Sequence, residues 1–403
     1  MRIASDDGRR SILTYCTNVH PIEELSAAID ALSRFCAPVR GRLSAERLSL
    51  GLWLSRRAAR TLADSSDERR RLAEALAANG LEAVTLNAFP YGDFHAERVK
   101  QDVYRPDWSD PRRFEYTLDL ARILAELLPR DVDEGTISTL PLGYAPWMDA
   151  DRLGACAQAL ARLAAELDGI AQTTGRSVRL CLEPEPDCAV ETTRQAIDFF
   201  WGPLLAAARR LGTSDRALGQ HLGLCFDACH QAVQFEDPAR AWSDLVEAGI
   251  QVGKIQLSCA LATRGESADT LAPFDEPRFL HQVRRRRQGG GRDSRSDLGL
   301  ALGENEALSR DGDWRVHFHA PLHWRPQAGE PLGTTVDDLL RLLPEILKAE
   351  RLPHLEVETY TWNVLPEHLR PQDDASLIAG IAREIEFVER ELARVGIRRE
   401  ASA

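Results

Sequence analysis

The chain has no long apolar run, and its basic residues are outnumbered by acidic ones. Its 403 residues include 50 Lys and Arg against 62 Asp and Glu, a formal net charge of −12. Proteins that bind nucleic-acid backbones concentrate positive charge on one face, so this balance argues against nucleic acid as the partner. No uninterrupted apolar run approaches the length of a membrane span, so we expect no direct membrane insertion.

Three further signatures are missing. The first residues, MRIASDDGRR, lack the apolar core of a secretory signal, so we expect none. The eight cysteines do not show the CxxC spacing of zinc fingers or redox sites, which predicts small buried thiols in a reducing compartment, the cytoplasm. No glycine-rich dinucleotide motif follows the first apolar run, which disfavours a Rossmann fold.

Short apolar runs alternate with amphipathic stretches along the whole chain. Nine runs are typical of strands: 11–16, 48–54, 82–89, 136–143, 177–184, 221–228, 252–259, 314–321 and 354–361. Strands that alternate with helices predict a parallel sheet. About eight such units indicate a closed (β/α)8 TIM barrel, which we expect to span residues 1–403 as a single domain.

One strand candidate is surplus, and the excess arises between 252 and 321. Either VGKIQLSC (252–259) or WRVHFHAP (314–321) is the seventh barrel strand, and the other is an accessory strand. We expect an insertion at 262–313. Within it, the arginine-rich run RRRRQGGGRDSR (284–295) predicts a solvated loop, because charge runs beside glycines rarely pack.

Carboxylates stand at the ends of three strand candidates, where TIM barrels build their active sites. Glu183 ends the fifth run, Asp227 the sixth and Glu358 the last. Neighbouring carboxylates repel one another unless protons or a cation neutralise them. Oxygen ligands with one imidazole suit manganese, magnesium, cobalt or zinc, so the pattern predicts a divalent metal site. Taken alone, Asp227 would be more typical of a helix cap, and Glu185, after a proline, is expected to face solvent.

These stretches resemble the xylose isomerase-like TIM barrels, a superfamily of sugar phosphate isomerases and epimerases that also includes nucleases of the endonuclease IV type. The likeness is carried by LEPEP, by CFDACH and by HFH followed by GEPLG. A closer resemblance is to the bacterial EboE metabolite-traffic proteins. It is carried by YCTNVHP, TLNAFPYGDFH, VKQDVYRPDW, CFDACHQAVQFED, KIQLS, WRVHFHAPLHW and HLEVETYTWNVLP.

The resemblance implies a ligand set and catalytic roles. Glu183, Asp227 and Glu358 match metal ligands, and His319, the second histidine of HFH, matches the histidine ligand. If VGKIQLSC is the seventh strand, Gln256 takes the place of that histidine. Glu183 and Glu358 would also serve as catalytic base and acid.

Substrate contacts are expected around the same cavity. His230, three residues after Asp227, matches a substrate-contacting histidine and would orient or protonate a substrate oxygen as a third catalytic residue. Aromatic rings in the following loops suit a sugar, a polyol or a polyphenol-like metabolite. The other candidates for substrate contact are His20, Asn87, His95, Trp108, Gln256 and His317.

Three functions remain open. The first is a metal-dependent sugar (phosphate) isomerase or epimerase that acts on or handles a small-molecule metabolite in an Ebo-type metabolite-traffic pathway, with other proteins of that pathway as partners. The second is a non-catalytic metabolite carrier on the same barrel. The third is an endonuclease IV-like phosphodiesterase, which is weaker because the second strand has no histidine and the third ends in Asn87. Whether the site turns over is left open.

Overall fold

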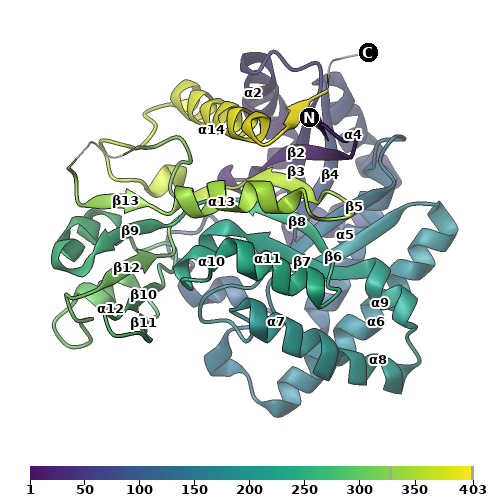
Figure 1. Cartoon of the computed structure of the whole chain (residues 1–403). Helices are drawn as coiled ribbons and strands as arrows, with labels where there is room; N and C mark the ends of the chain where they lie inside the picture. Colours follow the sequence, from purple (N-terminus) through teal and green to yellow (C-terminus); the bar gives the residue numbers. More distant parts are fainter. Residues whose placement is uncertain (326–328, 401–403) are drawn as a thin grey trace.

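Eight parallel strands form a closed barrel in the computed structural model, which describes residues 1–325 and 329–400 (Figure 1). Around the barrel they are β2 (Arg10–Cys16), β3 (Leu48–Trp53), β4 (Leu81–Asn87), β5 (Glu134–Thr139), β6 (Ser177–Leu182), β7 (Leu222–Asp227), β8 (Val252–Leu257) and β14 (His354–Val357). The barrel closes because β14 pairs in parallel with β2, with Leu355 opposite Leu13. This confirms the predicted (β/α)8 TIM barrel.

Helices join these strands and cover the outside of the barrel (Figure 1). They are α1 (Leu25–Ala31), α2 (Ala37–Arg42), α3 (Arg56–Asp64), α4 (Ser66–Ala78), α5 (Pro111–Leu127), α6 (Ala150–Thr174), α7 (Thr193–Phe199), α8 (Leu205–Leu211), α9 (Asp215–His221), α10 (Ala228–Val233), α11 (Pro238–Glu247), α13 (Val336–Ile346) and α14 (Asp374–Arg394). Sequence signals set their ends: Ser65 caps α4 by accepting from the backbone N–H of Glu68. Two short strands, β1 (Arg2–Ser5) and β15 (Ile397–Arg399), pair antiparallel beside β2.

The barrel interior holds a buried ion pair. Lys254 on β8 and Glu356 on β14 have no exposed side-chain surface, and Lys254 Nζ lies 2.6 Å from Glu356 Oε1. Thr14 Oγ1 donates to the other carboxylate oxygen at 3.2 Å. Gly51 leaves the room for this pair, because a Cβ there would lie 1.4 Å from Glu356 Oε2. Glu356 therefore belongs to the interior, whereas Glu358 follows the end of the strand.

A five-stranded antiparallel sheet is inserted between β8 and β14 and lies beside the barrel (Figure 1). Its strands are β9 (Leu261–Arg264), β10 (Val283–Arg286), β11 (Arg292–Arg295), β12 (Asp313–Val316) and β13 (Leu332–Thr334), with α12 (Leu298–Leu302) between β11 and β12. The strand order is β11-β10-β12-β9-β13. VGKIQLSC therefore supplies the seventh barrel strand, and WRVHFHAP begins in the accessory strand β12.

The arginine-rich run is only partly a solvated loop: residues 286–292 are exposed as expected, but 284–286 and 292–295 form strands and Arg284 and Arg285 are buried. Its first arginines belong to β10, which pairs with β11 and β12. Acidic partners make this possible: the Arg284 guanidinium is buried, 2.7 Å from Asp187 Oδ1 and 2.9 Å from Glu191 Oε2. A buried guanidinium is tolerated when carboxylates pair with it.

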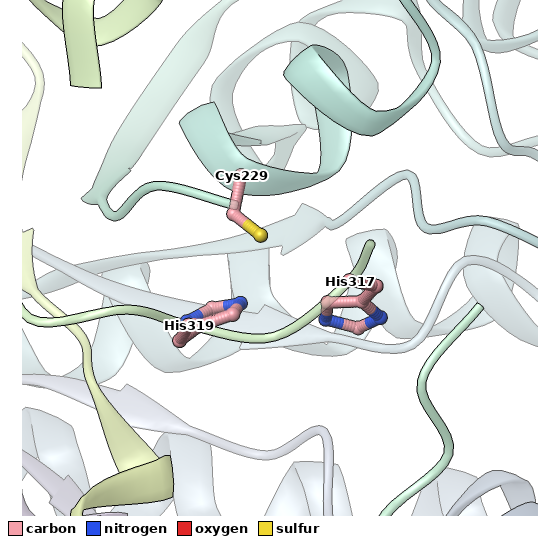
Figure 2. A group of neighbouring side chains, drawn as sticks. All are labelled: Cys229, His317 and His319. Carbon is pink, nitrogen blue, oxygen red and sulfur yellow. The ribbon is translucent and has the colours of Figure 1, made fainter. Parts of the chain in front are cut away.

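After β12 the chain passes over the barrel before it rejoins the inserted sheet in β13. This segment carries His317 and His319 to the N-terminal turn of α10, where they lie next to Cys229 (Figure 2). All eight cysteines are free and buried, as expected. None of the helices in the described residues has both the length and the apolar character needed to cross a membrane.

Candidate metal centre

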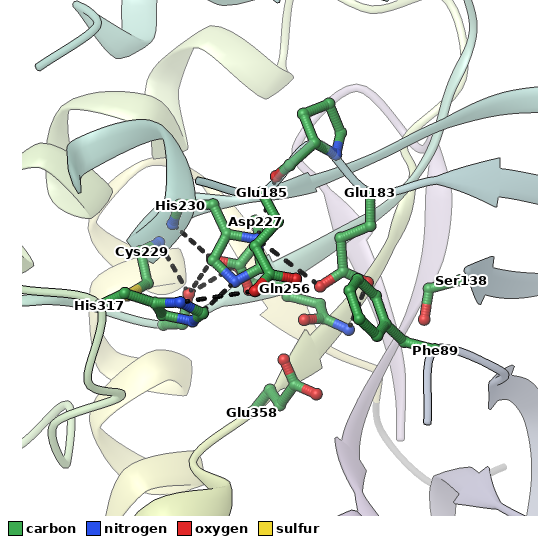
Figure 3. Close-up of polar contacts among 12 residues, drawn as sticks. Phe89, Ser138, Glu183, Glu185, Asp227, Cys229, His230, Gln256, His317 and Glu358 are labelled. Atoms are coloured by element: carbon green, nitrogen blue, oxygen red, sulfur yellow. Dashed lines mark hydrogen bonds and ion pairs between the residues drawn. The ribbon is translucent and has the colours of Figure 1, made fainter. Parts of the chain in front are cut away.

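Three acidic side chains converge at the carboxyl ends of the barrel strands. Glu183 follows β6, Asp227 ends β7 and Glu358 follows β14, and all three are buried. One oxygen of each lies within 4.8 Å of the other two, because parallel barrel strands end around a common axis. Figure 3 shows these side chains with Gln256 of β8 among them. The carboxylates at the three strand ends therefore meet in one place.

Asp227 uses its two oxygens differently. Oδ1 accepts hydrogen bonds from the backbone N–H of His230 and from Ser258 Oγ, both at 2.9 Å, and so caps α10. Oδ2 lies 3.9 Å from His319 Nε2. The helix-cap and ligand interpretations of Asp227 are therefore compatible, because each involves a different oxygen.

The carboxylate cluster is unfavourable in its charged form. Burial raises the pKa of Glu183 well above its usual value, and the charges of Glu358 and Asp227 raise it further. Burial, followed by the charge of Asp227, likewise raises the pKa of Glu358. Lys254 lowers both pKa values, but its ammonium group is already paired with Glu356. The cluster therefore needs protons or a cation for charge balance.

Gln256 donates hydrogen bonds to this cluster through its side-chain amide. With the amide nitrogen turned toward the carboxylates, it donates to Glu183 Oε1 at 3.1 Å, to Asp227 Oδ2 at 2.8 Å and also to Glu358 Oε2. The surrounding acceptors favour this orientation. An amide has two N–H protons and no net charge. Gln256 therefore does not remove the need for charge compensation.

His319 reaches the cluster from the inserted segment. Its Nδ1 lies 2.9 Å from the backbone oxygen of Glu358, and its buried Nε2 has no hydrogen-bond partner within the described chain. A buried nitrogen without a partner is unfavourable, whereas an imidazole whose other nitrogen is held by a carbonyl is typical of a metal ligand. Three carboxylates and one imidazole with a free lone pair therefore fit a divalent cation.

A second polar group lies beside the carboxylate cluster. His230 Nε2 and His317 Nε2 are 3.0 Å apart. Burial lowers the pKa of His230 to about 4 and that of His317 well below its usual value. Glu185 accepts from Tyr104 Oη at 2.7 Å and from Gln282 Nε2 at 3.3 Å, and burial raises its pKa to about 8. The expectation that Glu185 faces solvent was therefore wrong.

These groups form the floor of a cavity whose walls are largely apolar. The apolar and aromatic lining includes Phe89, Phe94, Val99, Tyr104, Phe279 and Tyr360. The cavity volume is about 60 Å³, which is well below the roughly 300 Å³ of a small ligand site. A substrate of sugar size can therefore enter only if the lining loops move.

Three of the residues expected to contact substrate lie outside the cavity lining. His20 stacks on Phe35 with ring centroids 4.4 Å apart, and Trp108 Nε1 donates to Thr139 Oγ1 at 3.2 Å. His95 is half-buried on the loop after β4. The structure brings the other expected contacts to the carboxylate cluster or the lining: Asn87, Gln256 and His317.

Further hydrogen bonds hold the site together, and one of the residues involved, Gln282, was not a candidate from the sequence. Asn18 and Asn87 both donate to Glu358 Oε1, at 2.8 and 2.9 Å. Gln282 Oε1 lies 2.6 Å from His317 Nδ1, and no local pattern marks this glutamine. Glu185 did have a signal, because residues two apart in an extended segment share a face, here with Glu183.

Comparison with known proteins finds no matching family model and no matching curated protein. A solved xylose isomerase-like TIM barrel protein from Mycobacterium smegmatis, in complex with magnesium, is similar with a TM-score of 0.51 and 10% identity, over 95% of this chain and 98% of that chain. A D-tagatose 3-epimerase-like protein gives 0.49 and 12%, over 95% and 98%. An IOLI protein with bound zinc gives 0.48 and 12%, over 95% and 99%. The first likeness supports the barrel fold.

Proposed function

We propose that this protein is a divalent-metal-dependent isomerase or epimerase that acts on a small polyhydroxylated metabolite. The main support is the buried cluster of Glu183, Asp227 and Glu358, together with the unpartnered His319 Nε2 that lies 3.9 Å from Asp227. A site that only binds a neutral metabolite has no use for three desolvated carboxylates. Perturbed titratable groups inside a cavity are typical of reactive sites.

Glu183, Asp227, Glu358 and His319 would hold the ion. This oxygen-rich set suits magnesium and manganese, and cobalt and zinc also bind such ligands. When bound, the ion would supply Lewis-acid polarisation of a substrate carbonyl or hydroxyl oxygen.

Glu183 and Glu358 are the proposed proton carriers. They follow β6 and β14, which are separated in the barrel by β7 and β8, so they approach the cavity from different directions. Removal of a proton by one carboxyl group and its return by another is what epimerisation requires. Asn18 and Asn87 fix the orientation of Glu358 through its Oε1. His230 would contact a substrate oxygen.

The cavity walls support a narrower proposal for the metabolite. Phe94, Tyr104, Phe279 and Tyr360 offer aromatic surface above the polar floor, which suits a ligand with an apolar or aromatic face, including a polyphenol-like one. The EboE-like motifs support a role in a metabolite-traffic pathway with partner proteins. A carrier on the same barrel is the second candidate, because the aromatic walls could hold such a ligand without turnover.

The first test is metal content by elemental mass spectrometry on protein purified without chelator. We expect near-stoichiometric metal in the wild type and its loss from the carboxylate site in Asp227→Ala. Asp237→Ala is the matched control, because Asp237 also caps a helix, α11, but is exposed there. A wild type that lacks metal and binds no added manganese, magnesium, cobalt or zinc would refute the proposal.

Turnover is tested separately, by deuterium exchange from D2O into a panel of hydroxyketones followed by NMR. Exchange that is present in the wild type and lost in Glu358→Gln would support isomerase or epimerase chemistry. Tight ligand binding to metal-loaded protein without exchange would instead identify a carrier.

A further inference from the structure

Three buried histidines at the barrel mouth are held in the same way. His230 Nδ1 and His319 Nδ1 lie 3.0 and 2.9 Å from backbone carbonyl oxygens, and His317 Nδ1 lies 2.6 Å from Gln282 Oε1. These oxygens only accept, so Nδ1 carries the proton of each neutral ring. The Nε2 atom of each ring is then left with a lone pair.

The orientation of Gln282 is fixed by its own partners. Its amide nitrogen donates to Tyr104 Oη at 2.8 Å and to the backbone oxygen of Pro186 at 3.0 Å. The amide oxygen must therefore face His317, which places the His317 ring proton on Nδ1.

Two lone pairs consequently face each other. His230 Nε2 and His317 Nε2 are 3.0 Å apart, and neither ring has a proton to donate there. Tyr360 Oη, at 3.4 Å from His317 Nε2, supplies at most one long hydrogen bond and leaves His230 without a donor. A proton or a cation bound by both nitrogens would remove the conflict, and the Cys229 thiol next to His317 favours the cation by offering a further ligand.

We propose that His230 and His317, together with Cys229 next to His317, form a second cation site that adjoins the carboxylate cluster. Two ligands of one ion, each bonded at about 2.1 Å, lie about 3.0–3.4 Å apart, and the two Nε2 atoms have this separation. Ligand atoms of Cys229, His317 and His319 lie within 4.8 Å of one another, and Figure 2 shows the thiol directed toward the two rings. Ligand atoms of Asp227, His230 and His319 also lie within 4.8 Å of one another. We assign His319 to the carboxylate ion, which leaves Cys229 as the third ligand of the second.

The two sites differ in chemistry. Nitrogen and sulfur ligands select zinc or cobalt, whereas the carboxylate cluster suits magnesium or manganese. Cys229 would bind as the thiolate, so metal binding releases its proton to solvent. The second site does not depend on the proposed reaction, because none of its three ligands belongs to the carboxylate cluster.

The test is a cobalt titration of the full chain after removal of metal with a chelator, followed by elemental analysis and absorption spectroscopy. We expect the wild type to bind two Co²⁺ per chain and to show a near-ultraviolet thiolate-to-cobalt band. Cys229→Ser should lose the band, and His317→Gln should bind one ion. Cys156→Ser, which alters a buried cysteine on α6, should keep both ions and the band.

A variant of the carboxylate cluster separates the two proposals. Glu358→Gln should lose the carboxylate ion and keep the thiolate band, so the failure of one site is distinguishable from the failure of the other. One Co²⁺ per chain in the wild type without the band would overturn the second site, as would a band that survives in Cys229→Ser. The cobalt stoichiometry and the absorption band of the wild type test the second site without any substitution. Circular dichroism shows whether each variant is folded.

Discussion

Removal of Lys254 should be one of the most damaging single substitutions in the chain. The ammonium and its partner Glu356 have no exposed side-chain surface and lie 2.6 Å apart inside the barrel. Lys254→Met preserves most of the volume but leaves a buried carboxylate without its cation. Breaking a buried pair in this way costs about 3–5 kcal/mol. The free energy of unfolding, measured by urea denaturation with a chelator present, should fall by that amount.

The double variant Lys254→Met/Glu356→Gln should recover much of this loss, because neither partner then carries a buried charge. The matched control is Arg60→Met. It breaks the ion pair of Arg60 with Asp64 on α3, in which the side chains are 59% and 57% exposed, and should cost less than about 1 kcal/mol. If Lys254→Met is no more destabilising than Arg60→Met, the barrel interior does not depend on this pair and the reasoning fails.

Three further predictions follow from buried groups near the site. Burial raises the pKa of Glu384 from 4.5 to about 7. As the pH rises, the carboxyl group therefore loses its proton at a lower pH in the unfolded chain than in the folded one. The free energy of unfolding should therefore fall by about 3 kcal/mol between pH 4.5 and 7. Glu384→Gln should reduce this pH dependence in denaturation curves, and an equal pH dependence in wild type and variant would contradict a raised pKa for Glu384. Asn87→Ala removes a donor to Glu358 and should weaken metal binding by about 10-fold in calorimetry, whereas unchanged affinity would show that the amide does not orient the carboxylate. Gly51→Ala places a Cβ against Glu356 and should lower stability by about 1–3 kcal/mol; an unaltered Tm would mean that Glu356 moves freely.

The barrel could be predicted because its signals are local. Each βα unit shows an apolar run for the strand, a capping residue and apolar residues at helical spacing. The carboxylates Glu183, Asp227 and Glu358 stand at the ends of such apolar runs, where a barrel places its active site. Such signals need no knowledge of distant parts of the chain.

The rest of the site depends on long-range packing. The inserted strands separate β8 from β14, so the sequence offers two candidates for the seventh barrel strand. The structure brings a residue of each candidate, Gln256 and His319, to the carboxylate cluster. Gln282 directly precedes β10 of the inserted sheet, and this sheet does not belong to the repeating βα pattern of the barrel. Side chains beyond the strand ends, including His20 and Trp108, can turn toward helices or the cavity, and sequence does not fix their direction.

The origin of the histidines has a consequence for local opening. The carboxylates come from the barrel, but His317 and His319 arrive only when the inserted sheet is docked. A cation held by both parts would therefore be released whenever the sheet detaches, even while the barrel stays closed. By linkage, the same ion would suppress that detachment. Added metal should slow amide hydrogen exchange in β12 and leave exchange in β5, on the far side of the barrel, at its metal-free rate.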